Sequence, residues 1–128
     1  MITFNVLIII FLLYILYNYY NRCDDYYEYY DDDFTIKESK IHGNGVFSLK
    51  NFLKGSMLFK TIENNQKITF LGSKINHCQL EKTNTYIEKT EDGWILFASK
   101  DINKDDELLA DYNNTPSFIK KPDKNWSC

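Results

Sequence analysis

The 128 residues are enough for one folded domain, and a content of 44% hydrophobic and 26% charged residues indicates that most of the chain folds. Three cysteines and two histidines are too few for a disulfide framework or a four-thiolate zinc site, so no metal site is expected. Residues 22–33 hold six acids and one base, whereas residues 34–128 hold 14 bases and 12 acids. This basic excess is too small for a nucleic-acid groove, and no direct nucleic-acid partner is expected.

The first 21 residues carry no charged side chain, and the stretch from Val6 to Tyr17 is continuously apolar or aromatic. As a helix, residues 2–20 reach about 28 Å, close to the hydrocarbon thickness of a bilayer. Residues 1–21 are therefore predicted to be a single transmembrane helix that anchors the chain to a membrane. A cleaved signal peptide and a buried core helix are the alternatives, but the basic leading segment, the cleavage site and the polar face that they need are missing.

Residues 22–33 alternate acidic side chains with tyrosines and have almost nothing to bury. Such a segment is typical of a solvated, extended chain. It is predicted to be an acidic, tyrosine-rich spacer between the membrane anchor and a domain at residues 34–128.

The sequence that follows the spacer has the pattern of short strands. Apolar–polar alternation or short apolar runs, separated by turn signals, occur at residues 34–39, 41–48, 57–62, 85–89, 94–99 and 107–112. The Asp92-Gly93 pair between two of these runs is a strong hairpin signal. Because no long amphipathic helix accompanies the runs, residues 34–128 are predicted to form a mainly β domain.

Three short motifs in this domain carry the residues of a candidate site. Residues 43–45 (Gly-Asn-Gly) let the chain approach a ligand closely because no Cβ intervenes at either glycine, although such a motif is also common in turns. Residues 76–78 (Asn-His-Cys) follow an apolar residue and are equally typical of a cap or turn. Residues 107–112 (Glu-Leu-Leu-Ala-Asp-Tyr) could be an edge strand with a core tyrosine.

The order and context of these motifs resemble the SET domain of protein lysine methyltransferases. The Gly-x-Gly entry, the Asn-His pair with a following Asn84, and the Glu-Leu-x-x-Asp-Tyr signature occur in that order, and the resemblance covers about residues 34–126. It implies a mainly β SET-domain fold of short strands with a C-terminal pseudoknot, preceded here by the single transmembrane helix. The compact domain, in a chain with one Arg and 14 Lys, is similar to minimal SET proteins of bacteria and large DNA viruses with AT-rich genomes.

The resemblance implies a protein lysine methyltransferase that transfers a methyl group from S-adenosylmethionine to a lysine amine of a protein, histone or non-histone. The residues that would bind the cofactor are Gly43, Asn44, Gly45, Asn76, His77 and Trp126. Tyr112 matches the catalytic tyrosine, which aligns the lysine amine. Tyr86 and Phe118 fall where the family lines the lysine channel or covers it.

Several positions depart from the family's pattern. Cys78 stands where Ser is usual, Thr83 replaces a Pro, and Asp105 replaces the Gly that opens the last signature. The insert between Gly45 and Asn76 is also short. These departures keep open a catalytically degenerate SET module that acts as a membrane-tethered binding protein, and a small β domain whose resemblance is accidental.

The implied chemistry bears on where the domain would lie. S-adenosylmethionine and reduced thiols are cytosolic, so a working enzyme needs residues 34–128 on the cytosolic side of the membrane. Arg22 is the only base beside the apolar stretch and gives a weak orientation signal. The expectation is therefore a single-pass membrane protein whose SET domain faces the cytosol.

Overall fold

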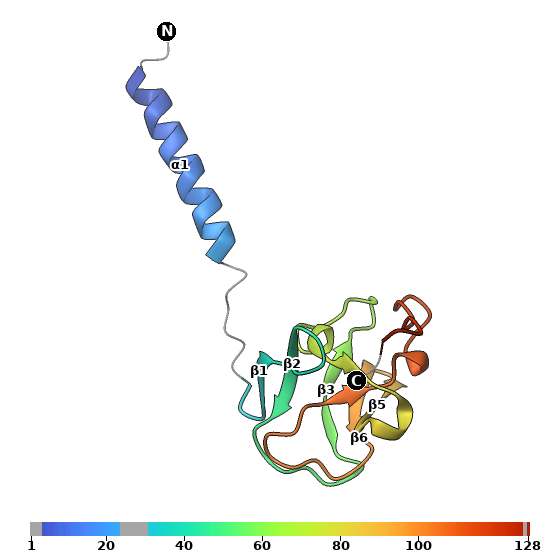
Figure 1. Cartoon of the computed structure of the whole chain (residues 1–128). Coiled ribbons are helices and arrows are strands. Elements are labelled where there is room, and N and C mark those ends of the chain that lie inside the picture. Colours follow the sequence, from blue (N-terminus) through green and yellow to red (C-terminus); the bar gives the residue numbers. More distant parts are fainter. Residues whose placement is uncertain (1–3, 24–30, 127) are drawn as a thin grey trace.

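The structure, a computed structural model, describes residues 4–23, 31–126 and 128. It comprises a helix, α1 (Phe4–Cys23), and a separate body of short strands (Figure 1). The described side chains of α1, at residues 6–18, are exposed. The helix continues past the predicted boundary at residue 21, and residues 24–30 of the predicted spacer lie outside the described residues.

The helix expected at the N-terminus is present, but the role predicted for it has no support. Within residues 4–23, 31–126 and 128, no helix is both long enough and apolar enough to cross a bilayer. The structure therefore gives no basis for the transmembrane anchor expected at residues 1–21.

Five of the six predicted runs are strands, arranged in two antiparallel sheets. The first sheet pairs β1 (Phe34–Glu38) with β2 (Asn44–Ser48), and the second has the order β3 (Met57–Ile62), β6 (Gly93–Ala98), β5 (Thr85–Thr90). Both sheets contribute to one core, whose buried members are Phe34, Val46, Leu71, Ile75, Leu96, Ala98, Ile102, Leu108 and Ala110. The mainly β prediction for residues 34–128 is confirmed.

The hairpin predicted at Asp92-Gly93 joins β5 to β6. Thr90 pairs with Gly93, which leaves Glu91 and Asp92 as a two-residue loop. Gly93 has a φ of 115°, in the region that favours glycine, and a Cβ at this position would collide with the Ile62 carbonyl oxygen on β3. The glycine therefore serves both the turn and the packing of the neighbouring strand.

The third sheet pairs two segments that are far apart in the sequence. Strand β4 (Asn76–His77) runs parallel to β7 (Leu109–Ala110), and the side chain of Asn84 holds the same segment from another direction. Asn84 donates from Nδ2 to the Glu107 carbonyl (2.8 Å) and accepts at Oδ1 from the Leu109 amide (2.9 Å). A C-terminal pseudoknot requires such contacts between the Asn-His segment and residues 107–112.

The sixth predicted strand is shorter than the run at residues 107–112. After β7 the chain enters a 3₁₀ turn, η4 (Tyr112–Asn114). The Asp111 side chain caps this turn, because its Oδ1 accepts a hydrogen bond from the Asn113 amide (2.9 Å). Two more 3₁₀ turns, η2 (Gly72–Lys74) and η3 (Leu80–Lys82), flank β4. The turn at η4 redirects the chain so that Tyr112 lies beside β4 rather than continuing a strand.

One departure from the family's pattern has a visible backbone consequence. Asp105, which replaces a glycine, has a φ of 74°. This left-handed region is costly for most side chains, but aspartate is among the residues that tolerate it. The backbone conformation that would favour glycine is therefore retained at this position with a different residue.

Candidate active site

Two cavities meet where β4 and β7 end. The first has a volume of about 580 Å³ and is lined by Ile41, His42, Gly43, Asn44, Ser73, Lys74, Ile75, Asn76, His77, Tyr112, Asn125 and Trp126. The second has a volume of about 230 Å³ and is lined by Thr61, Ile62, Ile68, Gly72, Ser73, Ile75, Ile87, Leu96, Ala110, Tyr112, Thr115 and Ile119. Ser73, Ile75 and Tyr112 line both cavities and form the wall between them.

The loop between β1 and β2 forms one side of the first cavity. It is closed by a hydrogen bond from the Ser39 amide to the Gly43 carbonyl (2.8 Å). Gly43 has a φ of 47°, and a Cβ there would meet nothing within 4 Å, so glycine serves the backbone conformation and leaves open space beside it. Gly43 and Asn44, two of the residues predicted to bind a cofactor, both line the cavity.

Gly45 lies behind the first cavity, unlike Gly43 and Asn44, which line it. It is buried and is not among the residues that line the first cavity. A Cβ at Gly45 would collide with the carboxylate of Glu107, and it would lie 3.3 Å from Asn76 Nδ2. Gly45 therefore lets Glu107 approach Asn76 from behind the cavity.

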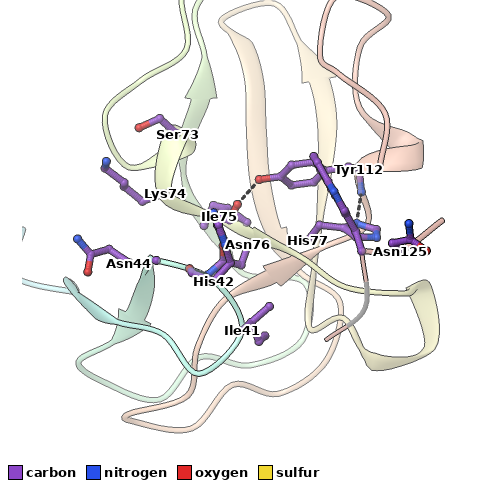
Figure 2. A pocket seen from close by; sticks show the side chains of 12 residues that line it. Ile41, His42, Asn44, Ser73, Lys74, Ile75, Asn76, His77, Tyr112 and Asn125 are labelled. Atoms are coloured by element: carbon purple, nitrogen blue, oxygen red, sulfur yellow. Dashed lines mark hydrogen bonds between the residues drawn. The ribbon is translucent and has the colours of Figure 1, made fainter. Parts of the chain in front are cut away.

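The side chain of Asn76 is fixed by two acceptors. Its Nδ2 donates to Glu107 Oε1 (2.9 Å) and to the His42 carbonyl (3.0 Å), which uses both amide hydrogens. Asn76 is only 9% exposed, yet it lines the first cavity (Figure 2). Within the described part of the chain, no donor is recorded for Asn76 Oδ1, so this oxygen is free to accept a hydrogen bond from a ligand.

His77 holds the backbone of the predicted catalytic tyrosine. The Tyr112 amide donates to His77 Nδ1 (3.1 Å), which means that Nδ1 carries no proton and the neutral imidazole has its hydrogen on Nε2 (Figure 2). Asp111 Oδ1 lies 3.9 Å from the same nitrogen. Because Nδ1 accepts from an amide, we interpret this as contact with a neutral ring rather than as an ion pair.

The Tyr112 hydroxyl lies at the wall between the two cavities. It donates a short hydrogen bond to the Ile75 carbonyl (Figure 2). Burial raises the pKa of the Tyr112 hydroxyl above its ordinary value of 10.0, so the group stays protonated at neutral pH. With its proton directed to Ile75, the oxygen retains lone pairs that can accept from a group in either cavity.

The C-terminal segment covers the first cavity from outside. The Trp126 ring lies 6.4 Å from the His77 ring and 6.5 Å from the Tyr112 ring, measured between centroids. A disulfide between Cys78 and Cys128 ties this segment to the residue that follows His77. Sequence reasoning missed this pair, because two cysteines 50 residues apart show no pattern that predicts their contact.

The second cavity is mostly apolar and, apart from Tyr112, is built from residues that the sequence did not single out. Most of its lining consists of isoleucine, leucine and alanine side chains from β3, β5, β6, β7 and the segments around η2 and η4. Such a cavity suits an aliphatic chain such as the stem of a lysine side chain. No local motif marks these positions, because the cavity forms only when distant strands pack together.

Two residues expected at the substrate channel lie elsewhere. Tyr86 is 41% exposed and stacks on Phe97 of β6, and it lines neither cavity. Its neighbour Ile87 lines the second cavity instead. Phe118 is 43% exposed and also lines neither cavity, whereas the adjacent Ile119 does. From these two segments, Ile87 and Ile119 line the second cavity in place of Tyr86 and Phe118.

The composition of the site bears on metal chemistry. Among the residues that the structure describes, no group of three or more His, Cys, Asp or Glu side chains is placed to hold a metal ion. The C-terminal segment is instead held to the body by the Cys78–Cys128 disulfide.

Comparisons with known proteins bear on the fold. No protein-family model and no curated protein sequence matches the chain. A Plasmodium falciparum protein proposed to be a histone methyltransferase superposes with a TM-score of 0.52 and 24% identity, over 65% of this chain and 95% of that one. The methyltransferase domain of human PR domain-containing protein 2 superposes with a TM-score of 0.54 and 16% identity, over 70% of this chain and 84% of that domain.

These likenesses settle the question of fold. The matched structures are SET-domain methyltransferases, and residues 34–128 have the same type of mainly β architecture. The fold that the motifs led us to expect is therefore present. A compact viral or bacterial type is not distinguished by these matches.

Proposed function

We propose that this chain is a methyltransferase that uses S-adenosylmethionine to methylate the side-chain amine of a lysine in a protein. The observation that carries the proposal is the wall shared by the two cavities, which holds the hydroxyl of Tyr112 and the carbonyl of Ile75. The fold is that of SET-domain methyltransferases, and the two matched proteins are described as methyltransferases. Both the fold and the arrangement of cavities favour a reaction between two ligands that meet at this wall.

The first cavity has the features that an aminoacyl nucleoside needs. Its volume of about 580 Å³ lies within the range of about 300–1,000 Å³ that is common for small-molecule sites. The open space beside Gly43 lets a ligand approach the backbone. Asn76 offers its free side-chain oxygen as a hydrogen-bond acceptor, and Trp126 offers an aromatic face. We assign S-adenosylmethionine to this cavity; when bound, it supplies a methyl group on a positively charged sulfur.

The second cavity suits the other reactant. Its apolar walls can surround the four methylene groups of a lysine and remove water from the amine. Tyr112 accepts from the amine N–H while its own proton stays directed to the Ile75 carbonyl. This arrangement aligns the nitrogen lone pair without a charged catalytic group, because the raised pKa keeps the tyrosine neutral.

The transfer itself is a single displacement. S-adenosylmethionine held in the first cavity would supply its methyl group to the lysine nitrogen, and the electron pair of the carbon–sulfur bond would stay on sulfur. The amine enters neutral and leaves its extra proton to water after transfer. The contribution of the chain is alignment and exclusion of water, for which hydroxyl and carbonyl oxygens at the wall between cavities are suited.

The proposal is tested with the full chain. Titration calorimetry with S-adenosylmethionine should show saturable binding, and incubation with a library of lysine peptides should give products heavier by whole methyl groups in mass spectra. The matched control is the same library with arginine in place of lysine, which should stay unmodified. A folded chain that binds no S-adenosylmethionine would contradict the proposal, and binding without transfer to any lysine peptide would favour a degenerate SET module.

A further inference from the structure

We infer that Glu107 is a positioning residue that fixes the polarity of the Asn76 amide, so that the first cavity presents an acceptor to a protonated amine. This inference rests on the proposed function and concerns the amino-acid end of the cofactor. Glu107 lines neither cavity, so it would act through Asn76 rather than on the ligand directly.

The carboxylate of Glu107 is held at both oxygens. Oε1 accepts from Asn76 Nδ2 (2.9 Å), and Oε2 accepts from Ser39 Oγ (3.0 Å). Ser39 Oγ is itself fixed, since it accepts from the Ile41 amide (3.0 Å). The missing Cβ of Gly45 makes room for the carboxylate. The orientation of Glu107 is therefore determined before any ligand enters.

Glu107 and His42 together exclude the other orientation of the Asn76 amide. In the observed orientation, Nδ2 faces the Glu107 carboxylate and the His42 carbonyl, which are both acceptors. If the amide turned over, Oδ1 would face two oxygens, one of them charged, and both hydrogen bonds would become repulsions. The carbonyl oxygen of Asn76 must therefore lie on the opposite side, toward the cavity that Asn76 lines.

A fixed carbonyl oxygen selects its ligand. It accepts from an N–H and repels an anionic oxygen, so it suits the protonated amine of an amino acid and not its carboxylate. The charge of Glu107, bonded directly to the amide, also polarises the Asn76 carbonyl and strengthens it as an acceptor. We therefore predict that Ser39 and Glu107 orient Asn76, and that the side-chain oxygen of Asn76 binds the amine.

The test compares three probes on the wild-type chain and on Glu107→Gln by titration calorimetry. S-adenosylmethionine carries amine and carboxylate, its decarboxylated form carries only the amine, and 5′-methylthioadenosine carries neither. Glu107→Gln keeps the shape but allows the Asn76 amide to turn, so affinity for the two amine-bearing probes should fall about 10- to 100-fold, as for a lost hydrogen bond to a charged group. Affinity for 5′-methylthioadenosine should stay within about 2-fold of the wild type.

A double-mutant cycle separates positioning from simple charge attraction. If Glu107 acts through Asn76, then Glu107→Gln should have almost no effect on affinity in a chain that already carries Asn76→Ala. If Glu107 attracts the cationic ligand on its own, the two effects should add, and the inference is overturned. Glu88→Gln is the matched control: it removes the same charge from an exposed residue of β5 that lines neither cavity, and it should leave all three affinities unchanged.

Two further readouts keep the outcome clear. Ser39→Ala removes a hydrogen bond to the Glu107 carboxylate but keeps the carboxylate. It should give a smaller loss of affinity for the two amine-bearing probes, and it can be measured even if Glu107→Gln folds poorly. Exchange of the Asn76 side-chain amide hydrogens, followed by NMR, should be slower in the wild type than in Glu107→Gln. A wild type that binds the three probes while Glu107→Gln binds them equally well overturns the inference alone. A folded wild type that binds none of the probes overturns the proposed function together with it.

Discussion

The two sides of the first cavity are held by different kinds of interaction. The inner segment, residues 107–112, is bonded to several separate parts of the body. Among these bonds are those from the Leu108 amide to the Val46 carbonyl (2.8 Å), those with the Asn84 side chain, and the one from the Tyr112 amide to His77. The C-terminal segment, residues 116–126 with Cys128, is held by one disulfide, by ring contacts of Trp126 and by exposed hydrogen bonds from Lys121 to the Thr115 and Tyr112 carbonyls. The inner segment also contributes to the core, whereas Trp126 is 40% exposed.

This difference indicates that the two segments contribute differently to stability and to ligand binding. In the proposed reaction the inner segment positions the reacting groups. It cannot move without breaking buried hydrogen bonds, which cost more than exposed ones. The contacts of Trp126 in the C-terminal segment are more exposed, so we expect their loss to cost less stability than a change in the inner segment. Changes that disturb the contact between Glu107 of the inner segment and Asn76 should therefore reduce stability and binding together, and changes to the C-terminal segment should separate the two properties.

The largest effect is expected for Gly45→Ala, behind the inner segment. The new Cβ would collide with the Glu107 carboxylate and push it away from Asn76. Stability is then reduced both by the steric overlap and by loss of the hydrogen bond between Asn76 and the charged carboxylate. We expect the free energy of unfolding to fall by about 3–5 kcal/mol, measured by urea denaturation. Gly43→Ala is the control, because its Cβ meets nothing and only the positive φ is unfavourable, at a cost of about 1 kcal/mol. Equal losses for the two variants would contradict the collision.

A smaller loss of stability is expected when the disulfide is removed. Cys78 and Cys128 close a loop with a sequence separation of 50 residues. Cys128→Ser should lower the free energy of unfolding by about 2–4 kcal/mol, because the unfolded chain regains freedom. Dithiothreitol should lower the free energy of unfolding of the wild type by the same amount and leave that of Cys128→Ser unchanged. A wild type that is insensitive to the reductant would show that the cysteines are not paired in solution.

The smallest effect on stability is expected at the Trp126 ring. Trp126→Ala removes an aromatic face from the first cavity while little buried area is lost. We expect affinity for S-adenosylmethionine to fall by about 0.5–1.5 kcal/mol with a melting temperature close to that of the wild type. Phe118→Ala is the matched control, since Phe118 is similarly exposed and lines neither cavity. Equal affinities for the Trp126→Ala chain and the wild type would remove this ring from the site.

Local pattern was sufficient for the strands. The alternation and turn signals predicted β3 at its observed residues, and the Asp92-Gly93 pair predicted the β5–β6 hairpin. Each of these features depends on neighbours within a few residues along the chain. The family resemblance, and not the local pattern, placed Gly43, Asn44, Asn76, His77 and Tyr112 at one site. These five residues line the first cavity, Gly45 lies behind it, and their roles stay predictions.

The errors at the site come from strand register and from long-range contacts. In β5, Thr85 is buried and bonds to the Leu109 carbonyl (2.7 Å), so Tyr86 must point to the opposite face and Ile87 again inward. A shift of one residue therefore exchanges an exposed tyrosine for a channel residue. The second cavity and the Cys78–Cys128 pair depend on segments that meet only in the folded chain, and no local pattern encodes them. The predicted cytosolic orientation of the domain stays a prediction.

The role of Tyr112 at the wall between the cavities is the central claim, and Tyr112→Phe tests it most directly. The change keeps the ring and removes only the hydroxyl that bonds to the Ile75 carbonyl. The measurement is single-turnover methylation of an accepted lysine peptide, with calorimetry of S-adenosylmethionine and a thermal melt of both chains. The account predicts a rate that falls by about 10- to 1,000-fold, with cofactor affinity and melting temperature almost unchanged. Equal rates for two folded chains would contradict it and leave Tyr112 as a packing residue.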